Sequence, residues 1–252
     1  MQAESARTSS SSATRVAELL ILGALFLAGC GRIGFDGLDS GPSGDSARPS
    51  VDAASGSLSF AGLCDFESHV IVENGIAVDD DVGQRLSEAV EAGCASAIAS
   101  RAVSQDNASA VDADSGRPLT PATELVILGG GDGPHRVVRY LLQMDTPLIW
   151  GGSPTATLTE RVSGRVIVEG TTDLSNDFIF LQVILEPIGG TISLSGQGFR
   201  ENGTVAAAIY FENVVGPGIR EENASWIVVR WSDTDATTGP SAGDTFTLVE
   251  SG

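Results

Sequence analysis

The sequence predicts a three-layer α/β domain built on one mixed sheet, with antiparallel strands added towards the C-terminus. Three observations point to this fold. Strand-like and helix-like segments alternate in the first half, the second half contains more strand than helix, and two apolar strands, starting at Glu124 and Thr191, each pass through a glycine turn into a helix. Hydrophobic residues make up 42% of the 252 positions, which is enough to fill a core.

The first half is expected to contain a parallel crossover. A strand at 68–73 precedes a helix at 82–100, in which Asp81 and Gln84 have the spacing of an N-cap and its N3 partner. A strand at 124–128 then leads through the glycine turn to a helix at 134–144, and Pro134 suits the first helical position. The apolar residues 147–150 follow as a buried strand. Such a strand-helix-strand order indicates a right-handed crossover.

The second half is expected to add antiparallel pairs. Residues 165–169 and 178–186 are predicted to be neighbouring strands around a turn at 171–176. The segment 191–214 repeats the strand, glycine turn and helix, with Asn202 or Thr204 as the helix cap. Two final strands, 225–231 and 245–249, are joined by an acidic loop.

The N-terminus has the pattern of an export signal. Arg7 and Arg15 precede the apolar run LLILGALFLA at 19–28, and as a helix ten residues rise about 15 Å, too little to span a bilayer core. The residues LAGC at 27–30 resemble the lipobox of bacterial lipoproteins. This resemblance implies diacylglycerol transfer to Cys30, cleavage before it and acylation of the new amino terminus. The alternative is an ordinary signal peptide followed by an unmodified cysteine.

Three segments follow from this pattern. Residues 1–29 form a lipoprotein signal peptide, residues 30–59 a tether rich in Gly, Ser, Asp and Pro, and residues 60–252 a single α/β domain. The stretch GCGRIGFD at 29–36 resembles the start of many lipoproteins of myxobacteria. Gly31 replaces the aspartate that retains many lipoproteins at the inner membrane, which favours the outer membrane. We therefore expect a protein anchored in the cell envelope by its acyl chains and facing the periplasm or the cell surface.

Charge excludes several classes of function. The net charge is -19 and every basic residue is an arginine. Such a surface repels phosphate backbones, so we expect no nucleic-acid partner. The absence of lysine also excludes a Walker A lysine and Schiff-base chemistry.

The remaining two cysteines predict a disulfide. With Cys30 lipidated, Cys64 and Cys94 are an even pair in an oxidising compartment. Cys94 also continues an apolar stripe at helical spacing (Val82, Leu86, Val90), so a buried free thiol is the alternative.

A second resemblance concerns the domain itself. The stretch LVILGGGDGPHRVVRYLL, the later G-x-x-x-x-G-T-x-A-A-A at 198–208 and the W-x-D at 231–233 together look like α/β domains of prokaryotic surface-layer and related envelope proteins. The resemblance covers about residues 66–250. It implies a structural or binding module rather than a catalyst.

The glycine turns raise the question of nucleotide binding. The GGGDG core is similar to the cofactor loop of aminopropyltransferases and methyltransferases, but the third glycine of a dinucleotide fingerprint is Pro134 in one turn and Glu201 in the other. Asp132 would also place a carboxylate beside any phosphate, so we expect no bound nucleotide. The turns would instead form the edge of the sheet where another small ligand binds. This expected ligand edge consists of Gly129, Gly130, Gly131, Asp132, Gly133, Gly196 and Gly198.

Two motifs lie in the acidic loop between the last strands. Gly239, Ser241 and Gly243 match G-x-S-x-G, but this segment joins two strands, whereas a nucleophile elbow joins a strand to a helix. The loop also resembles a twelve-residue calcium loop, with a solvated acidic turn as the alternative reading. Its candidate calcium ligands are Asp233, Asp235, Thr237, Ser241 and Asp244.

The sequence favours a lipid-anchored structural or binding module over an enzyme. The alternative is an exported hydrolase that acts on polysaccharide or peptide. Convergent carboxylates in a deep pocket, or a Ser–His pair, would favour the hydrolase. We expect no cofactor other than calcium, and envelope proteins or glycans as partners.

Overall fold

A computed structural model describes residues 58–131, 135–144, 146–151, 155–235 and 237–252. The predicted signal peptide, the lipid attachment at Cys30 and most of the predicted tether lie outside these residues. So do Asp132, Gly133 and Pro134 of the first glycine turn. No described helix is long and apolar enough to cross a membrane.

The described residues form one seven-stranded mixed sheet and one three-stranded antiparallel sheet, as the predicted fold class requires. Strand order in the large sheet is β10-β9-β7-β8-β3-β1-β2. Strands β2, β1, β3 and β8 are mutually parallel. Strand β7 runs antiparallel to β8, β9 runs antiparallel to β7, and β10 runs antiparallel to β9. The strands of the large sheet are β1 Ser68–Glu73, β2 Ala99–Ser104, β3 Leu125–Gly129, β7 Asn176–Leu185, β8 Ile192–Gly198, β9 Trp226–Ser232 and β10 Thr245–Ser251.

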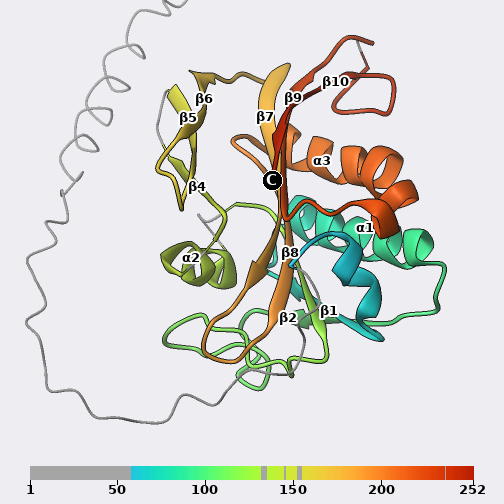
Figure 1. Cartoon of the computed structure of the whole chain (residues 1–252), viewed down its shortest axis with the longest axis vertical. Helices are drawn as coiled ribbons and strands as arrows, with labels where there is room; N and C mark the ends of the chain where they lie inside the picture. The colour runs from blue at the N-terminus through green and yellow to red at the C-terminus, as the bar shows by residue number, and fades with distance from the viewer. Residues whose placement is uncertain (1–57, 132–134, 145, 152–154, 236) are drawn as a thin grey trace, which may run out of the picture. The chain divides into compact units, whose positions relative to one another are not determined.

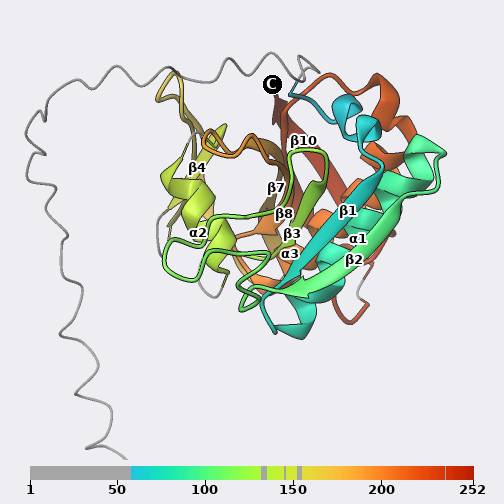
Figure 2. The same ribbon diagram turned by 90° about the horizontal axis from the view of Figure 1, so that it is seen from below.

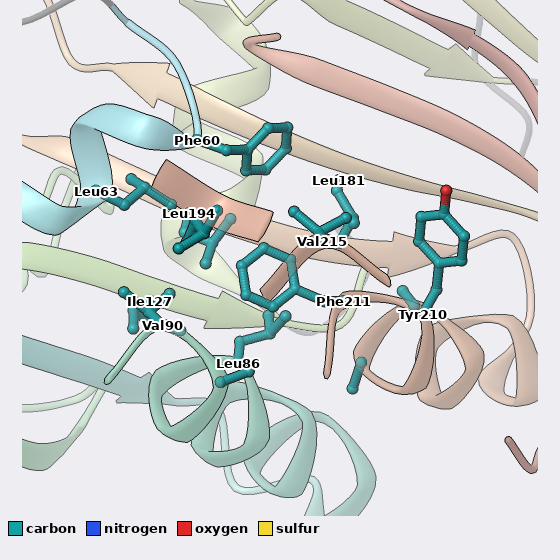
Figure 3. Packing of buried hydrophobic residues seen from close by; sticks show 14 of the residues in the cluster. Phe60, Leu63, Leu86, Val90, Ile127, Leu181, Leu194, Tyr210, Phe211 and Val215 are labelled. Atoms are coloured by element: carbon teal, nitrogen blue, oxygen red, sulfur yellow. The ribbon is translucent and has the colours of Figure 1, made fainter. Parts of the chain in front are cut away.

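Two helices cover one face of this sheet. Helix α1 (Ala77–Cys94) and helix α3 (Glu201–Tyr210) lie side by side on the right of the sheet in Figure 1. Three short helical turns complete this layer: η1 Ala61–Asp65, the π-helix η2 Phe211–Val215 and η3 Gly216–Glu221. Phe60, Leu86 and Phe211 fill the space between these elements and the strands (Figure 3), and all three side chains are fully buried.

The opposite face is covered by helix α2 (Arg136–Gln143) and the small sheet. The small sheet contains β4 Leu148–Gly151, β5 Thr155–Glu160 and β6 Val166–Thr171. Figures 1 and 2 both place these elements across the large sheet from α1 and α3. Their apolar side chains form two further clusters against the large sheet, around Leu128 and around Phe180. The domain is therefore three-layered.

The strand predicted at 68–73 is confirmed, but the following helix differs at both ends. Helix α1 begins at Ala77, so Asp81 lies inside it and is not its cap. Asn74 instead closes the turn before the helix, because its amide donates to Asp79 and its backbone N–H donates to Asp80. The helix ends where Ala95 adopts a left-handed conformation, with φ 49°. Residues 99 and 100, predicted as helix, begin strand β2.

The predicted crossover after the first glycine turn is wrong. Strand β4 belongs to the small antiparallel sheet, so β3, α2 and β4 do not form a parallel unit. The parallel unit in this half is β1-α1-β2. For the same reason β6 and β7 are not neighbours, although the sequence predicted that they pair. A short apolar segment such as 147–150 carries no periodicity that tells which sheet it joins.

Candidate functional site

The two glycine turns lie next to each other at one edge of the large sheet. Strands β3 and β8 are parallel neighbours, and Gly129 pairs with Gly196 in their register. Both strands therefore end at the same edge of the sheet. The structure thus brings together the described glycines of the ligand edge expected from the sequence.

At the first turn, Gly129 and Gly130 pack closely against the start of α1. Gly130 has φ +85°, a left-handed conformation that favours glycine, and a Cβ there would lie 2.1 Å from the carboxylate carbon of Asp79. A Cβ on Gly129 would lie 2.1 Å from the Asp79 carbonyl oxygen. Of the three described glycines in this turn, Gly131 alone has open space on its Cβ side. The described turn is thus mainly a packing contact between β3 and the start of α1.

The second turn packs against α3 in a similar way. A Cβ on Gly198 would lie 2.4 Å from the carbonyl carbon of Gly203. The predicted caps Asn202 and Thr204 both lie inside the helix, which begins at Glu201. The buried carboxylate of Asp177 on β7 reaches this helix start instead, where it accepts a hydrogen bond of 2.8 Å from the Arg200 N–H. The carboxylate that holds the residue before this helix therefore comes from another strand, which no local pattern reveals.

Carboxyl groups dominate the electrostatics of this edge. Burial raises the pKa of Asp177 to about 7, against the hydrogen bonds that it accepts from backbone N–H groups. Burial also raises the pKa of Asp79, and the nearby charges of Asp80 and Glu201 raise it further. A phosphate at this edge would meet these acidic groups, which argues against a nucleotide.

The acidic loop between β9 and β10 gathers three of the expected calcium ligands. Asp233, Asp235 and Asp244 each offer a carboxylate oxygen, and these oxygens lie within 4.8 Å of one another. Ser241 joins the group by donating its hydroxyl hydrogen to Asp235. Thr237 also contacts this group: its N–H donates to Asp235 at 3.0 Å, and its hydroxyl donates to the Gly239 carbonyl oxygen at 3.2 Å.

Hydrogen bonds fix part of this acidic loop in place. Asp244 is buried and accepts from the Trp231 indole at 3.0 Å and from the Ser241 N–H at 2.9 Å. The Oδ1 atom of Asp233 is enclosed and has no hydrogen-bond partner among the described residues. Clustered carboxylates with spare acceptor capacity have the chemistry that a hard cation requires.

Cys64 and Cys94 form a disulfide, with their Cα atoms 5.2 Å apart. The bond joins η1 to the last residue of α1. Cys94 is also fully buried in the apolar cluster of this layer, as its helical stripe suggested. The disulfide prediction is confirmed, and the alternative of a free thiol is wrong.

A Ser–His contact is present, but it lies in the core. The Nδ1 atom of His69 is 2.9 Å from the Ser87 hydroxyl, and the two residues are 0% and 2% exposed. Burial lowers the pKa of His69 to about 4, so its imidazole is a weak base. A substrate could not reach this pair in the folded domain. Ser241 of the G-x-S-x-G match donates to Asp235 and not to a histidine.

Comparison with known proteins adds no further assignment, since no protein-family model matches the chain and no curated protein matches it.

Sequence reasoning missed one group of polar side chains. Gln182 on β7 and Ser193, Ser195 and Gln197 on β8 are all buried between the large sheet and the layer of α2 and β4. We call these four residues the polar row. Its signal is visible in TISLSGQG at 191–198, where polar residues alternate with apolar ones. Alternation usually marks a strand with one solvated face, so it did not predict a buried polar surface.

Proposed function

We propose that this protein is a lipid-anchored component of the cell envelope whose α/β domain serves as a structural or binding module. The observation that carries the proposal is the LAGC segment directly after a short apolar run, with Cys30 as the lipidated residue. The disulfide agrees with this, because such bonds persist in oxidising compartments outside the cytoplasm. Gly31 after the anchor cysteine favours the outer membrane.

The described residues favour binding over catalysis. The Ser–His contact is inaccessible, and the gathered carboxylates lie in a loop between two strands rather than in a deep pocket. A hydrolase would need a nucleophile and a base, or two acids, around one substrate position. Envelope proteins or glycans are the partners that fit an exported, strongly acidic domain.

A calcium ion in the acidic loop is part of this proposal. Asp233, Asp235 and Asp244 supply the carboxylate oxygens, with Ser241 beside them. The enclosed Oδ1 atom of Asp233 supports the site, because a buried carboxylate oxygen is unfavourable unless it finds a donor or a cation. Calcium prefers six to eight oxygen ligands, so water molecules and loop carbonyl groups would complete the coordination.

Palmitate labelling tests the anchor. Cells that express the wild-type chain should incorporate labelled palmitate into the protein, and the protein should sediment with membranes. Cys30→Ala should lose both label and sedimentation, because the thiol that accepts the lipid is gone. Cys64→Ala serves as the matched control, since it removes a cysteine outside the lipobox and should keep the label. Equal labelling of Cys30→Ala and wild type would exclude this anchor.

A further inference from the structure

The polar row occupies a position that α/β domains usually fill with apolar side chains. Gln182, Ser193 and Ser195 are 0% exposed and Gln197 is 1% exposed. Gln182 lies directly opposite Ser195 in the register of β7 and β8. On the other face of the same strands, Leu181, Val183 and Leu194 form an ordinary apolar core. Strands covered on both faces are normally apolar throughout, so the difference between the faces needs an explanation.

The polar row is only partly hydrogen-bonded. The Gln197 amide donates to the Ser195 hydroxyl at 2.5 Å, and the Gln182 carbonyl accepts from the Leu148 N–H at 3.4 Å. The Gln182 Nε2, Ser193 Oγ and Gln197 Oε1 atoms have no partner within the described part of the chain. Native proteins pair nearly all of their buried polar groups. Three buried atoms without a hydrogen-bond partner on one small surface therefore indicate that these side chains do more than pack the two layers together.

The cover over the polar row is a separate layer. Ser195 and Gln197 on one side and Thr146 and Trp150 on the other line a narrow gap that has no room for a water molecule. The described residues that line this gap are all uncharged. The small sheet shares no strand pairing with the large sheet, and the hydrogen bonds described between the two layers all involve a side chain. The cover can therefore shift without breaking a strand ladder, by the sliding or hinge motions that packed layers allow, but this movement must separate side chains of the two apolar clusters beneath it.

The chemistry of this interface fits one class of ligand. Two carboxamides and two hydroxyls can both donate and accept hydrogen bonds, as the hydroxyls of a sugar ring require. An aromatic surface lies beside them, where the Trp150 and Phe180 ring centroids are 4.9 Å apart and can meet the apolar face of a sugar. A charged ligand would find no counter-ion here, and a peptide strand would need an open backbone edge.

We propose that the polar row is the floor of a binding site for a neutral saccharide, which enters when the layer of α2 and β4–β6 moves away from the large sheet. The gap between the two layers has no room even for a water molecule, so binding requires this movement. The inference rests on the proposed function as an exported binding module, and it assigns that module a site and a ligand class.

Saccharide titration of the purified full chain tests the site. Maltotriose, cellotriose and tri-N-acetylchitotriose are titrated separately, and binding is followed by calorimetry and by tryptophan fluorescence, to which Trp150 contributes. At least one trisaccharide should give a saturable signal in the wild type. Gln197→Leu and Gln182→Leu should each weaken that binding by about tenfold or more, because each removes a buried hydrogen-bonding group that faces the ligand.

The same variants separate a binding role from a structural one. If the carboxamides serve a ligand, Gln197→Leu should raise the thermal midpoint of the free protein by about 2–4 °C, because it removes the unpaired buried Oε1 atom, whereas Gln182→Leu also leaves the Leu148 N–H without its acceptor. A structural role predicts a lower midpoint. Gln143→Leu is the matched control, because this exposed amide lies on α2 outside the polar row and should leave binding unchanged.

Two outcomes would overturn the inference: no trisaccharide binds the wild type, or both leucine variants bind as tightly as the wild type. If the variants do not fold, as judged by circular dichroism, Ser195→Ala replaces them in the same comparison. Failure here is distinguishable from failure of the proposed function. Palmitate labelling of Cys30 does not depend on the polar row, so a labelled protein that binds no saccharide would retain the anchor and lose only this site.

Discussion

Three buried ionisable residues give the domain a defined dependence on pH. His135 is 0% exposed, and its Nε2 atom lies 3.0 Å from the Val72 carbonyl oxygen. Burial lowers the pKa of His135 to about 4, although the Val72 carbonyl and the charge of Asp80 oppose the change. His69 shows the same direction for the same main reason. Asp177 shows the opposite case, because burial raises its pKa to about 7.

Acid should destabilise the wild-type domain through His135. Its pKa falls from 6.5 in the unfolded chain to about 4 in the fold, so below pH 6.5 the unfolded state takes up a proton that the folded state rejects. The free energy of unfolding should therefore fall between pH 6.5 and 4, by up to about 3 kcal/mol from this residue. His135→Gln should flatten this part of the curve. Urea unfolding at a series of pH values measures the slope.

Asp177→Asn provides the control of opposite sign. The folded protein holds a proton on Asp177 between pH 3.8 and about 7, where the unfolded chain has lost it. This contribution to stability is complete below pH 3.8 and disappears as the pH rises through about 7. Removing it should make the gain in stability from pH 4 to 6.5 steeper than in the wild type. Equal slopes in the wild type and both variants would contradict these pKa assignments.

At the scale of single residues, the sequence predicted the contact between Cys64 and Cys94 but not the helix caps. The disulfide followed from composition and compartment, which are properties of the chain as a whole. The caps depend on partners elsewhere in the chain. Asp177 reaches the start of α3 from strand β7, and Asn74 bonds to Asp79 and Asp80 rather than to Asp81, the expected cap of α1. A local pattern cannot report such tertiary contacts.

At the scale of elements, the loop between β9 and β10 should respond to calcium. Trp231 is fully buried and donates to Asp244, so binding at the carboxylates should change its fluorescence. Calcium should also raise the thermal midpoint, because it binds the folded loop and not the unfolded chain. Asp233→Asn should weaken the response by about tenfold or more, since it removes a charged ligand.

The matched control for calcium is Glu221→Gln, which removes one exposed carboxylate from η3, outside the loop. It should titrate like the wild type. If the wild-type fluorescence does not change up to millimolar calcium, the loop is a solvated acidic turn. If Glu221→Gln weakens the response as much as Asp233→Asn, the effect reports overall charge and not a site.

The order of elements was largely predictable, but their distribution between the sheets was not. The strand at 68–73 and both strand-turn-helix units are visible in the sequence, because each combines a clear apolar period with glycine punctuation. Residues 147–150 are too short to show whether one or two faces are covered. In the structure Ile149 is 38% exposed, which a strand of the small sheet tolerates and a central parallel strand would not.

At the scale of the whole molecule, the two outer layers meet the sheet in different ways. The layer of α1 and α3 approaches closely through glycines and closes an apolar core. The layer of α2 and the small sheet covers a surface that contains the polar row. The sequence predicted a ligand site at the two glycine turns, but most of their described glycines pack against α1 and α3. The polar row becomes visible only when both coverings of β7 and β8 are known.

We propose above all that the mature chain begins at a lipidated Cys30. Intact mass spectrometry of the protein extracted from membranes tests this most directly. The expected mass is that of residues 30–252 with one disulfide, increased by a diacylglycerol group and an amide-linked acyl chain. A chain that begins at another residue, or that begins at Cys30 with no added lipid mass, would contradict it.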